Sequence, residues 1–353
     1  MACELDIHAG VLEAYSGTDS CVVVPWGVTR IQQRAFEGCT TLEHIELPAS
    51  VSVIDKVAFG GCTALKEVVF ASGEGETTEE KGGEEETTKG EATEEKATEE
   101  KATGLREIAY GAFRNCTALA TFNFPESLEH IGSWAFSKCS GLCSITLPSK
   151  LKRVDRDAFY GCSSLRYVRL PETLEALSDH IFYGCSALEE LHIPAGVNAV
   201  GSNVFTSCLH IHELWLEGGF IPQGFFAPAN LDVLVVPGMP FSAAVPPQLQ
   251  LPFAAGCVKL AAAEGEKSAL SPECEQFVTE HFDEILQAVR YEAPHTKWLI
   301  QKGFVLQQKA ASLATRAADF GQAEAAALLL EHAQQAAAPE SFSAFDLGFD
   351  LEL

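Results

Sequence analysis

A phenylalanine returns along this chain every 23 residues, with one longer gap between the second and third copies. Its positions are Phe36, Phe59, Phe113, Phe136, Phe159, Phe182 and Phe205, and a degenerate eighth copy is centred on Phe225. Apolar residues keep fixed places around each copy, before and after it. A fixed period of this length is typical of proteins whose repeats bury their apolar faces against one another. The chain is therefore expected to form a stack of eight repeats.

Each repeat ends in a segment that alternates apolar and polar residues. The segment is stopped by proline in most repeats, at Pro48, Pro125, Pro148, Pro171, Pro194 and Pro237. Alternation with period two is typical of a strand, and proline cannot continue a strand ladder. We expect these strands to pair from one repeat to the next, about 4.8 Å apart, along one side of an α/β repeat solenoid.

Two further columns follow the phenylalanine. The first holds Gly38, Gly61, Gly161 and Gly184, with Asn115 in the same place, and predicts a turn residue at positive φ. The next is a cysteine column: Cys39, Cys62, Cys116, Cys139, Cys162, Cys185 and Cys208. Thiols among Phe and Leu side chains are expected to be buried and unreactive. There is no C-x-x-C pair, and the H-x-H at His210 and His212 is interpreted as strand surface, so no metal site is predicted.

The recurring pattern I-x-x-x-A-F-x-G-C-x-x-L-x-x-I-x-L-P resembles the BspA-like, or treponemal-type, bacterial leucine-rich repeats. The resemblance covers about Val22–Pro237, with "VVVP" at 22–25 as the first strand. It implies a right-handed leucine-rich solenoid with a parallel sheet on its concave face. The apolar period after about residue 271 predicts a small α-helical region that follows the solenoid. The family resemblance also implies a binding function, commonly in bacterial surface proteins that adhere to host components or other cells.

The remaining segments break the repeat. The predicted parts are an N-terminal cap (1–21), the solenoid (22–237) with an acidic insert (71–104), a proline-rich connection (238–270) against the last repeat, an α-helical region (271–338) and an acidic-apolar tail (339–353). With 12 Glu and 4 Lys, the insert is predicted to be a disordered loop, either a tolerated expansion or a docking element. The helical region resembles a degenerate ankyrin repeat. The tail is expected to cover the protein's own surface or to bind a partner.

The net charge and the hydropathy of the chain limit the classes of partner that it is expected to bind. The formal net charge is −25, which disfavours nucleic acid and anionic membrane surfaces. No apolar run of about 20 residues is present, so membrane insertion is not expected. The start of the chain has neither a basic n-region nor an apolar h-region, which predicts a cytoplasmic protein. The alternative is the cell surface or periplasm, reached by another export route.

Outward-facing positions on the strands of repeats five to eight collect aromatic and charged side chains. The predicted partner-binding residues are Tyr167, Arg169, Glu190, His192, Glu213, Trp215, Val233 and Val235. Such side chains supply most of the binding energy at many protein interfaces. The alternative is that the C-terminal segment folds back over this surface.

We therefore expect a non-catalytic scaffold that binds a protein, with a bacterial adhesin or coat protein as the alternative. No G-x-S-x-G, P-loop, H-E-x-x-H or glycine-rich dinucleotide motif is present, so an enzyme is disfavoured. No cofactor or small-molecule ligand is indicated.

Overall fold

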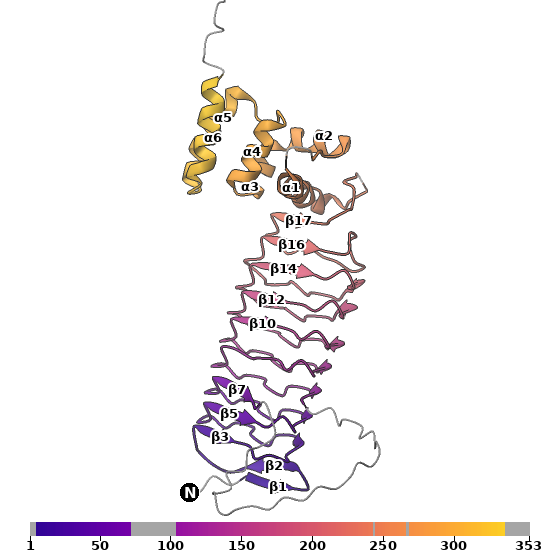
Figure 1. The fold of residues 1–353 in the computed structure, drawn as a ribbon, viewed down its shortest axis with the longest axis vertical. Coiled ribbons are helices and arrows are strands. Elements are labelled where there is room, and N and C mark those ends of the chain that lie inside the picture. The colour runs from indigo at the N-terminus through magenta and orange to yellow at the C-terminus, as the bar shows by residue number, and fades with distance from the viewer. Residues whose placement is uncertain (1–4, 72–103, 243, 266–267, 336–353) are drawn as a thin grey trace, which may run out of the picture. The chain divides into compact units, whose positions relative to one another are not determined.

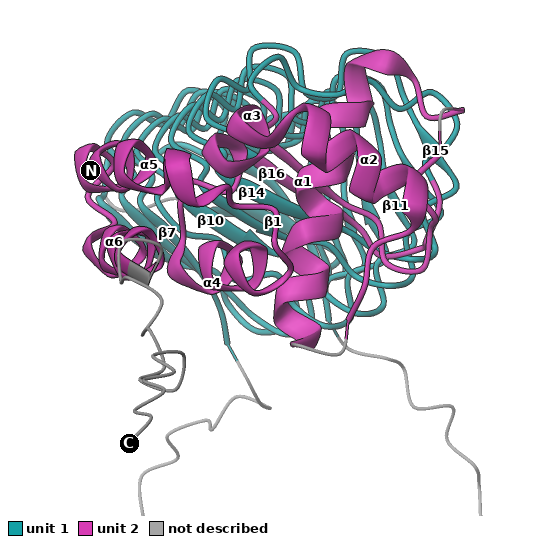
Figure 2. Ribbon diagram, turned by 90° about the horizontal axis from the view of Figure 1, so that it is seen from above, with its two compact units in different colours: residues 1–212, 221–230 teal, residues 213–220, 231–353 magenta. Residues whose placement is uncertain are grey.

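The computed structural model describes residues 5–71, 104–242, 244–265 and 268–335. Two compact units make up the chain: unit 1 contains residues 1–212 and 221–230, and unit 2 contains residues 213–220 and 231–353 (Figure 2). Apart from its end residues Ala71 and Gly104, the predicted acidic insert lies outside the described residues, as does the predicted tail.

The predicted strands form in unit 1 and pair in parallel (Figure 1). One sheet contains β3 (Cys21–Val23), β5 (His44–Leu47) and β7 (Glu67–Phe70). Farther along the chain, β10 (Ser144–Thr146), β12 (Tyr167–Arg169) and β14 (Glu190–Ile193) also pair in parallel. The corresponding segment of the third repeat, residues 121–124, is not a strand, so the ladder is interrupted there. The predicted fold class, a repeat solenoid with parallel sheets followed by helices, is confirmed.

A second set of short strands was not predicted from the sequence. It begins with an antiparallel hairpin, β1 (Leu5–His8) and β2 (Val11–Tyr15), inside the predicted N-terminal cap. Two-residue strands then follow one per repeat: β4 (Arg30–Ile31), β6 (Val53–Ile54), β8 (Glu107–Ile108), β9 (His130–Ile131) and β11 (Arg153–Val154). These form a seven-stranded sheet with β1 and β2, while β13 (Ala176–Leu177) pairs with β15 (Ala199–Val200). Two residues per strand are too few for a periodicity to appear in the sequence.

The core of unit 1 is a column of stacked aromatic rings. Tyr15 stacks on Phe36 with ring centroids 5.0 Å apart, and the stacking continues through the phenylalanine column to Phe182. Six cysteines add contacts between successive repeats. Each Sγ donates to the backbone carbonyl of a phenylalanine in the preceding repeat, and Cys162 Sγ, for example, lies 3.2 Å from Phe136 O. Each repeat is therefore held to its neighbour by ring stacking and by hydrogen bonds from a side chain to the backbone.

The positive φ predicted for the glycine column is present at every glycine in that column, with φ of 71–76°. Lys138 (φ 59°) and Ser207 (φ 62°) share this column and adopt the same conformation. The left-handed conformation turns the backbone N–H toward the next repeat: Lys138 N donates to Tyr160 O at 2.7 Å and Gly38 N to Gly60 O at 2.8 Å. The hydrogen bond between repeats offsets the strain that a non-glycine residue carries there.

Unit 2 contains the parallel strands β16 (Glu213–Leu216) and β17 (Val233–Val235) and six helices among the described residues. The helices are α1 (Pro247–Glu264), α2 (Pro272–Glu280), α3 (Phe282–Ala288), α4 (Ala293–Gln301), α5 (Gln307–Asp319) and α6 (Ala323–Gln335). Within the predicted α-helical region, α2 and α3 are separated at His281, whose φ of −113° and ψ of 31° lie outside the helical region. The ankyrin resemblance of this region stays a prediction.

Helix α1 occupies most of the segment predicted to be a proline-rich connection. Pro247 stands at the first helical position, where its missing N–H costs no hydrogen bond, and only Pro252 lies inside the helix. Apolar residues surround the helix on most sides, so no helical period is visible in the sequence. The segment does lie against the last repeat strand, because α1 packs on β17.

Candidate binding surface

Four of the eight predicted binding residues share one exposed surface of unit 1, on β12 and β14. Val168 and Leu191 point into the core, and the alternate residues Tyr167, Glu190 and His192 point outward. Tyr167 lies opposite Glu190 in the parallel register, and 57% of its surface is exposed. The His192 side chain hydrogen-bonds Glu190, with 2.8 Å between Nε2 and Oε1. With exposed Arg169, these residues form what we call the Tyr167 surface.

The other four predicted residues belong to unit 2, where helix α1 changes their exposure. Val233 is 4% exposed and Val235 is fully buried, because α1 packs on β17. Gly256 of α1 makes this close approach possible, since a Cβ there would lie 2.0 Å from the carbonyl oxygen of Leu234. The two valines therefore lie in the interior of unit 2, which corrects the expectation that they face a partner. The covering helix belongs to the segment 238–270, which was expected to lie against the last repeat.

Glu213 and Trp215 are only partly exposed, and both are tied to neighbouring side chains. Lys259 of α1 makes an ion pair with Glu213, with 2.5 Å between Nζ and Oε2, and the other carboxylate oxygen accepts a hydrogen bond from Trp215 Nε1. The Lys259 and Glu213 side chains retain only 25% and 19% of their exposure, so solvent screens this pair less than a surface pair. The network fixes α1 on β16 as well as on β17.

Histidine 295 lies on α4 of the same unit and is 6% exposed. Burial is the main cause that lowers its pKa below the ordinary value of 6.5, and nearby Lys259 lowers it further. The carboxylates of Glu292, at 3.4 Å from Nδ1, and Glu213 act in the opposite direction but do not reverse the shift. His295 is therefore neutral in the folded protein at neutral pH.

Acidification is expected to destabilise unit 2 through His295. Below pH 6.5 the unfolded chain binds a proton that the folded protein does not, so stability falls as the pH falls from 6.5 towards the folded pKa. The effect is measured by amide hydrogen exchange of α4 between pH 7 and pH 5. Each measured rate is divided by the intrinsic exchange rate at that pH, so that only the change in protection remains. The His295→Asn protein should lose this pH dependence, whereas His210→Asn, at an exposed position in unit 1, should keep it. An unchanged pH dependence in His295→Asn would assign the effect to another group.

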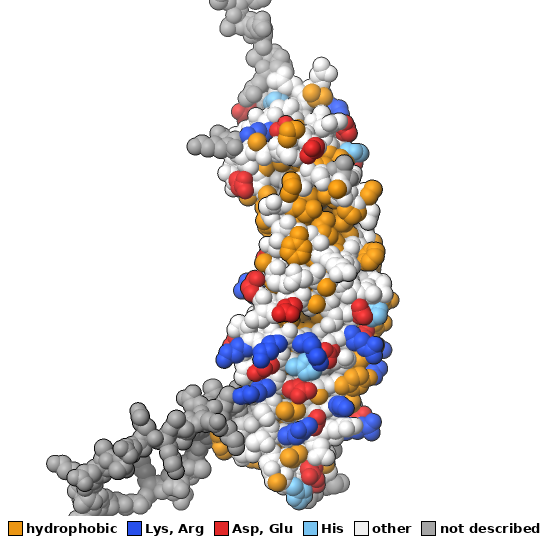
Figure 3. Space-filling view, turned by 90° about the vertical axis from the view of Figure 1, so that its right-hand side faces the viewer, with side chains coloured by type: hydrophobic (Ala, Val, Ile, Leu, Met, Phe, Trp, Pro, Cys, Tyr) orange, Lys and Arg blue, Asp and Glu red, His pale blue; other side chains and the backbone are white. Residues whose placement is uncertain are grey.

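Unit 1 also presents a charged face, along the short strands, where Lys, Arg, acidic and His side chains gather (Figure 3). The charges are paired between repeats: Arg30 Nε lies 2.7 Å from Asp55, Lys152 Nζ lies 2.6 Å from Glu129, and His130 Nε2 lies 3.1 Å from Asp155. These pairs neutralise part of the positive charge that a phosphate backbone would require. This face is therefore a weaker candidate for a functional site than the Tyr167 surface.

Six of the seven column cysteines are buried, as expected, whereas Cys39 is partly exposed and a hydrogen bond with Cys62 lowers its pKa. Burial raises the pKa of Cys116, Cys162 and Cys208 to about 12, so the thiolate form is negligible at neutral pH. Cys139 and Cys185 have pKa values shifted in the same direction for the same reason. The six buried thiols of the column are structural.

Metal and membrane contacts find little support among the described residues. Within these residues, only Asp6, His8 and Glu13 bring three such ligand atoms within 4.8 Å of one another, and all three are exposed on the N-terminal hairpin. We assign no metal to them. His210 Nδ1 instead lies 2.6 Å from the carbonyl oxygen of Ser186. In the described part of the chain no helix has the length and apolar character to cross a membrane.

Comparisons with known proteins agree with the repeat pattern. The family model for the BspA type leucine-rich repeat region matches six copies, at residues 14–80 and 100–229, which together exceed half of the chain. A solved leucine-rich repeat protein of Treponema pallidum is 31% identical, covering 57% of this chain and 82% of that one, with a TM-score of 0.45. One from Bacteroides ovatus is 18% identical, covering 66% and 69%, with a TM-score of 0.45. No curated protein sequence matches the chain. The chain belongs to the family of proteins with BspA-type leucine-rich repeats.

Proposed function

We propose that this protein is a non-catalytic scaffold that binds a protein partner on the Tyr167 surface of unit 1. The observation that carries the proposal is the exposed aromatic ring of Tyr167, set among Arg169, Glu190 and His192 on paired strands. Leucine-rich repeat folds are typically binding scaffolds and not enzymes. The partner-binding role fits a family of this kind.

Three properties of the Tyr167 surface favour a protein as its ligand. First, the tyrosine offers a large, rigid contact with a polar end, and such side chains dominate many interfaces. Second, charges of both signs surround the ring, which matches a mixed polar rim better than a strongly acidic or basic ligand. Third, the strands that carry these residues are fixed by parallel hydrogen bonding, so little conformational entropy is lost on binding.

Replacing Tyr167 with alanine is expected to weaken partner binding by about 2 kcal/mol or more, which is roughly a 30-fold loss of affinity. The partner is first captured from a lysate on the immobilised full chain and identified by mass spectrometry. Its dissociation constant is then measured by titration with the purified protein. The fold should survive, because the Tyr167 side chain is mostly in solvent.

Tyr110 provides a matched control. It is 44% exposed but belongs to a turn, away from the β10, β12 and β14 ladder, so Tyr110→Ala should leave the affinity unchanged. Equal affinities for wild type and Tyr167→Ala, with both proteins folded by circular dichroism, would rule out the Tyr167 surface as the binding site.

A further inference from the structure

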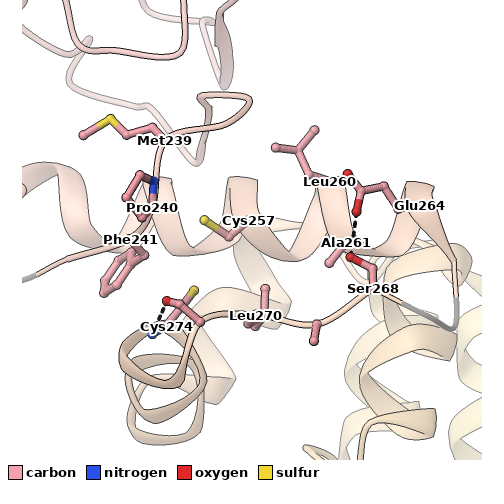
Figure 4. A pocket seen from close by; sticks show the side chains of 12 residues that line it. Met239, Pro240, Phe241, Cys257, Leu260, Ala261, Glu264, Ser268, Leu270 and Cys274 are labelled. Atoms are coloured by element: carbon pink, nitrogen blue, oxygen red, sulfur yellow. Dashed lines mark hydrogen bonds between the residues drawn. The ribbon is translucent and has the colours of Figure 1, made fainter.

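Two cysteines outside the repeat column face one another in unit 2. Cys257 belongs to α1 and Cys274 to α2, and both line a cavity of about 170 Å³ between these helices. In Figure 4 the two side chains lie on either side of the gap between the helices, and the Cys274 sulfur points toward α1. The rest of the lining is mainly apolar, from Met239, Phe241 and Leu270 among others.

The two thiols differ in access and in acidity. Cys274 is 1% exposed, whereas Cys257 is half-buried. Hydrogen bonding to Cys274 lowers the pKa of the Cys257 thiol, and the same contact together with burial raises the pKa of Cys274. Cys257 is thus the thiol that a reagent reaches and that ionises more readily, as required of an attacking nucleophile.

Cys274 is held in place by its helix. It lies in the first turn of α2, where its backbone N–H donates to the Ser271 hydroxyl at 3.3 Å. Ser271 caps this helix, so the Cys274 sulfur is directed at α1 by a fixed backbone. A fixed second thiol next to a reactive first one is the arrangement in which a mixed disulfide is resolved within the molecule.

Among the described cysteines, Cys39 and Cys62 show the same difference in access and acidity, but the buried thiol of that pair already donates a hydrogen bond. Six thiols of the repeat column already donate to phenylalanine carbonyls. Cys39, the first cysteine of the column, interacts with Cys62, and the Cys62 thiol already donates to Phe36 O. Cys21 lies on β3 and Cys143 directly precedes β10, and both are exposed in unit 1.

We propose that Cys257 and Cys274 form a thiol–disulfide exchange site whose substrate is a low-molecular-weight disulfide such as oxidised glutathione. The Cys257 thiolate attacks one sulfur of the substrate, its S–S bond breaks, and one thiol leaves after taking up a proton. Cys274 then gives up its proton and attacks the Cys257 sulfur, which releases the second thiol. Two protein thiols are oxidised to one disulfide, and the substrate is reduced to two thiols.

The product would join α1 covalently to α2. Helix α1 is the element that covers β17 and carries Lys259, the partner of Glu213. The new bond closes the loop between Cys257 and Cys274 and restricts the separation of the two helices. Oxidation is therefore expected to lower amide hydrogen exchange in α2. This proposal does not depend on the Tyr167 surface.

The test uses the full chain, equilibrated with mixtures of oxidised and reduced glutathione, quenched with acid and alkylated. Peptide mapping by mass spectrometry then locates each disulfide. The expected result is a Cys257–Cys274 disulfide at the lowest oxidised-to-reduced ratio. Cys21 and Cys143 should carry at most glutathione, and the six buried thiols of the repeat column should be alkylated only after unfolding. A first intramolecular disulfide elsewhere, such as Cys39–Cys62, or none at any ratio, would overturn the proposal.

Single variants test the order of the two steps. Cys274→Ser should accumulate glutathione on Cys257, because no second thiol resolves the mixed disulfide, and Cys257→Ser should leave Cys274 unmodified. Cys143→Ser is the matched control and should form the Cys257–Cys274 disulfide as the wild type does. Glutathione on Cys274 in Cys257→Ser, with the variant folded by circular dichroism, would contradict the assigned roles.

Discussion

Phe159→Ala is expected to lower the free energy of unfolding of unit 1 by about 3 to 5 kcal/mol. The Phe159 ring is fully buried and stacked between Phe136, at 5.5 Å, and Phe182, at 6.0 Å between ring centroids. Backbone hydrogen bonds hold the adjacent repeats at a fixed spacing. For example, Phe159 N donates to Ile181 O at 3.1 Å. The neighbours therefore cannot collapse into the cavity, and the loss of buried apolar contact is not recovered. Urea denaturation followed by circular dichroism measures the change.

Phe226→Ala is the matched control in the same unit. The Phe226 side chain is 74% exposed, so its truncation should change the stability by no more than about 0.5 kcal/mol. Because repeats contact only their neighbours, hydrogen exchange should show the loss in Phe159→Ala centred on the repeats around residue 159. Equal losses in the two variants would contradict the assignment of the phenylalanine column as the core.

Gly256→Val is expected to destabilise unit 2 by about 3 kcal/mol, the upper end for overpacking of a buried site. Even a Cβ at this position would lie 2.0 Å from the Leu234 carbonyl oxygen, and valine adds two methyl groups to it. Both backbones belong to regular structure, α1 on one side and β17 on the other, so neither can shift locally. Helix α1 should be displaced, and the buried valines at 233 and 235 should become exposed to solvent.

Amide hydrogen exchange of β17 provides the measurement for this variant. The amides of Val233–Val235 should exchange faster in Gly256→Val than in the wild type. Ala263→Val, on an exposed position of the same helix, should cost no more than about 0.7 kcal/mol, which is the helix propensity difference. Unchanged protection of β17 in Gly256→Val would show that α1 does not depend on close contact at this glycine.

The sequence predicted the repeat architecture well because every repeat carries the same residue types at the same spacing. The phenylalanine column places one ring per repeat, and stacking in register follows from the constant spacing. The glycine column also predicted a left-handed turn, which even Lys138 adopts. A second column of positive φ, which contains Val57 (57°) and Trp134 (62°), could not be predicted, because β-branched and bulky residues normally avoid this conformation. Hydrogen bonds between repeats, such as Val57 N to Tyr110 O at 2.9 Å, hold these residues there.

For the candidate surface too, one part could be predicted from the sequence and another part only from the tertiary structure. The alternation along each strand predicted which side chains point away from the core of their own repeat. The structure agrees for four of them, which are exposed: Tyr167, Arg169, Glu190 and His192. It could not tell whether another part of the chain covers that outward face. The residues of α1 carry no helical period, and the glycine that lets α1 approach β17 looks like any other glycine in the sequence.

By itself, the sequence therefore determined the period, the core column and the direction of each strand residue, because these depend on spacing and on the chemistry of single residues. Only the tertiary structure decided that Val233 and Val235 are covered by α1 and that Cys257 faces Cys274. Both outcomes depend on contacts between segments with no common period, and such contacts leave no regular signal along the chain.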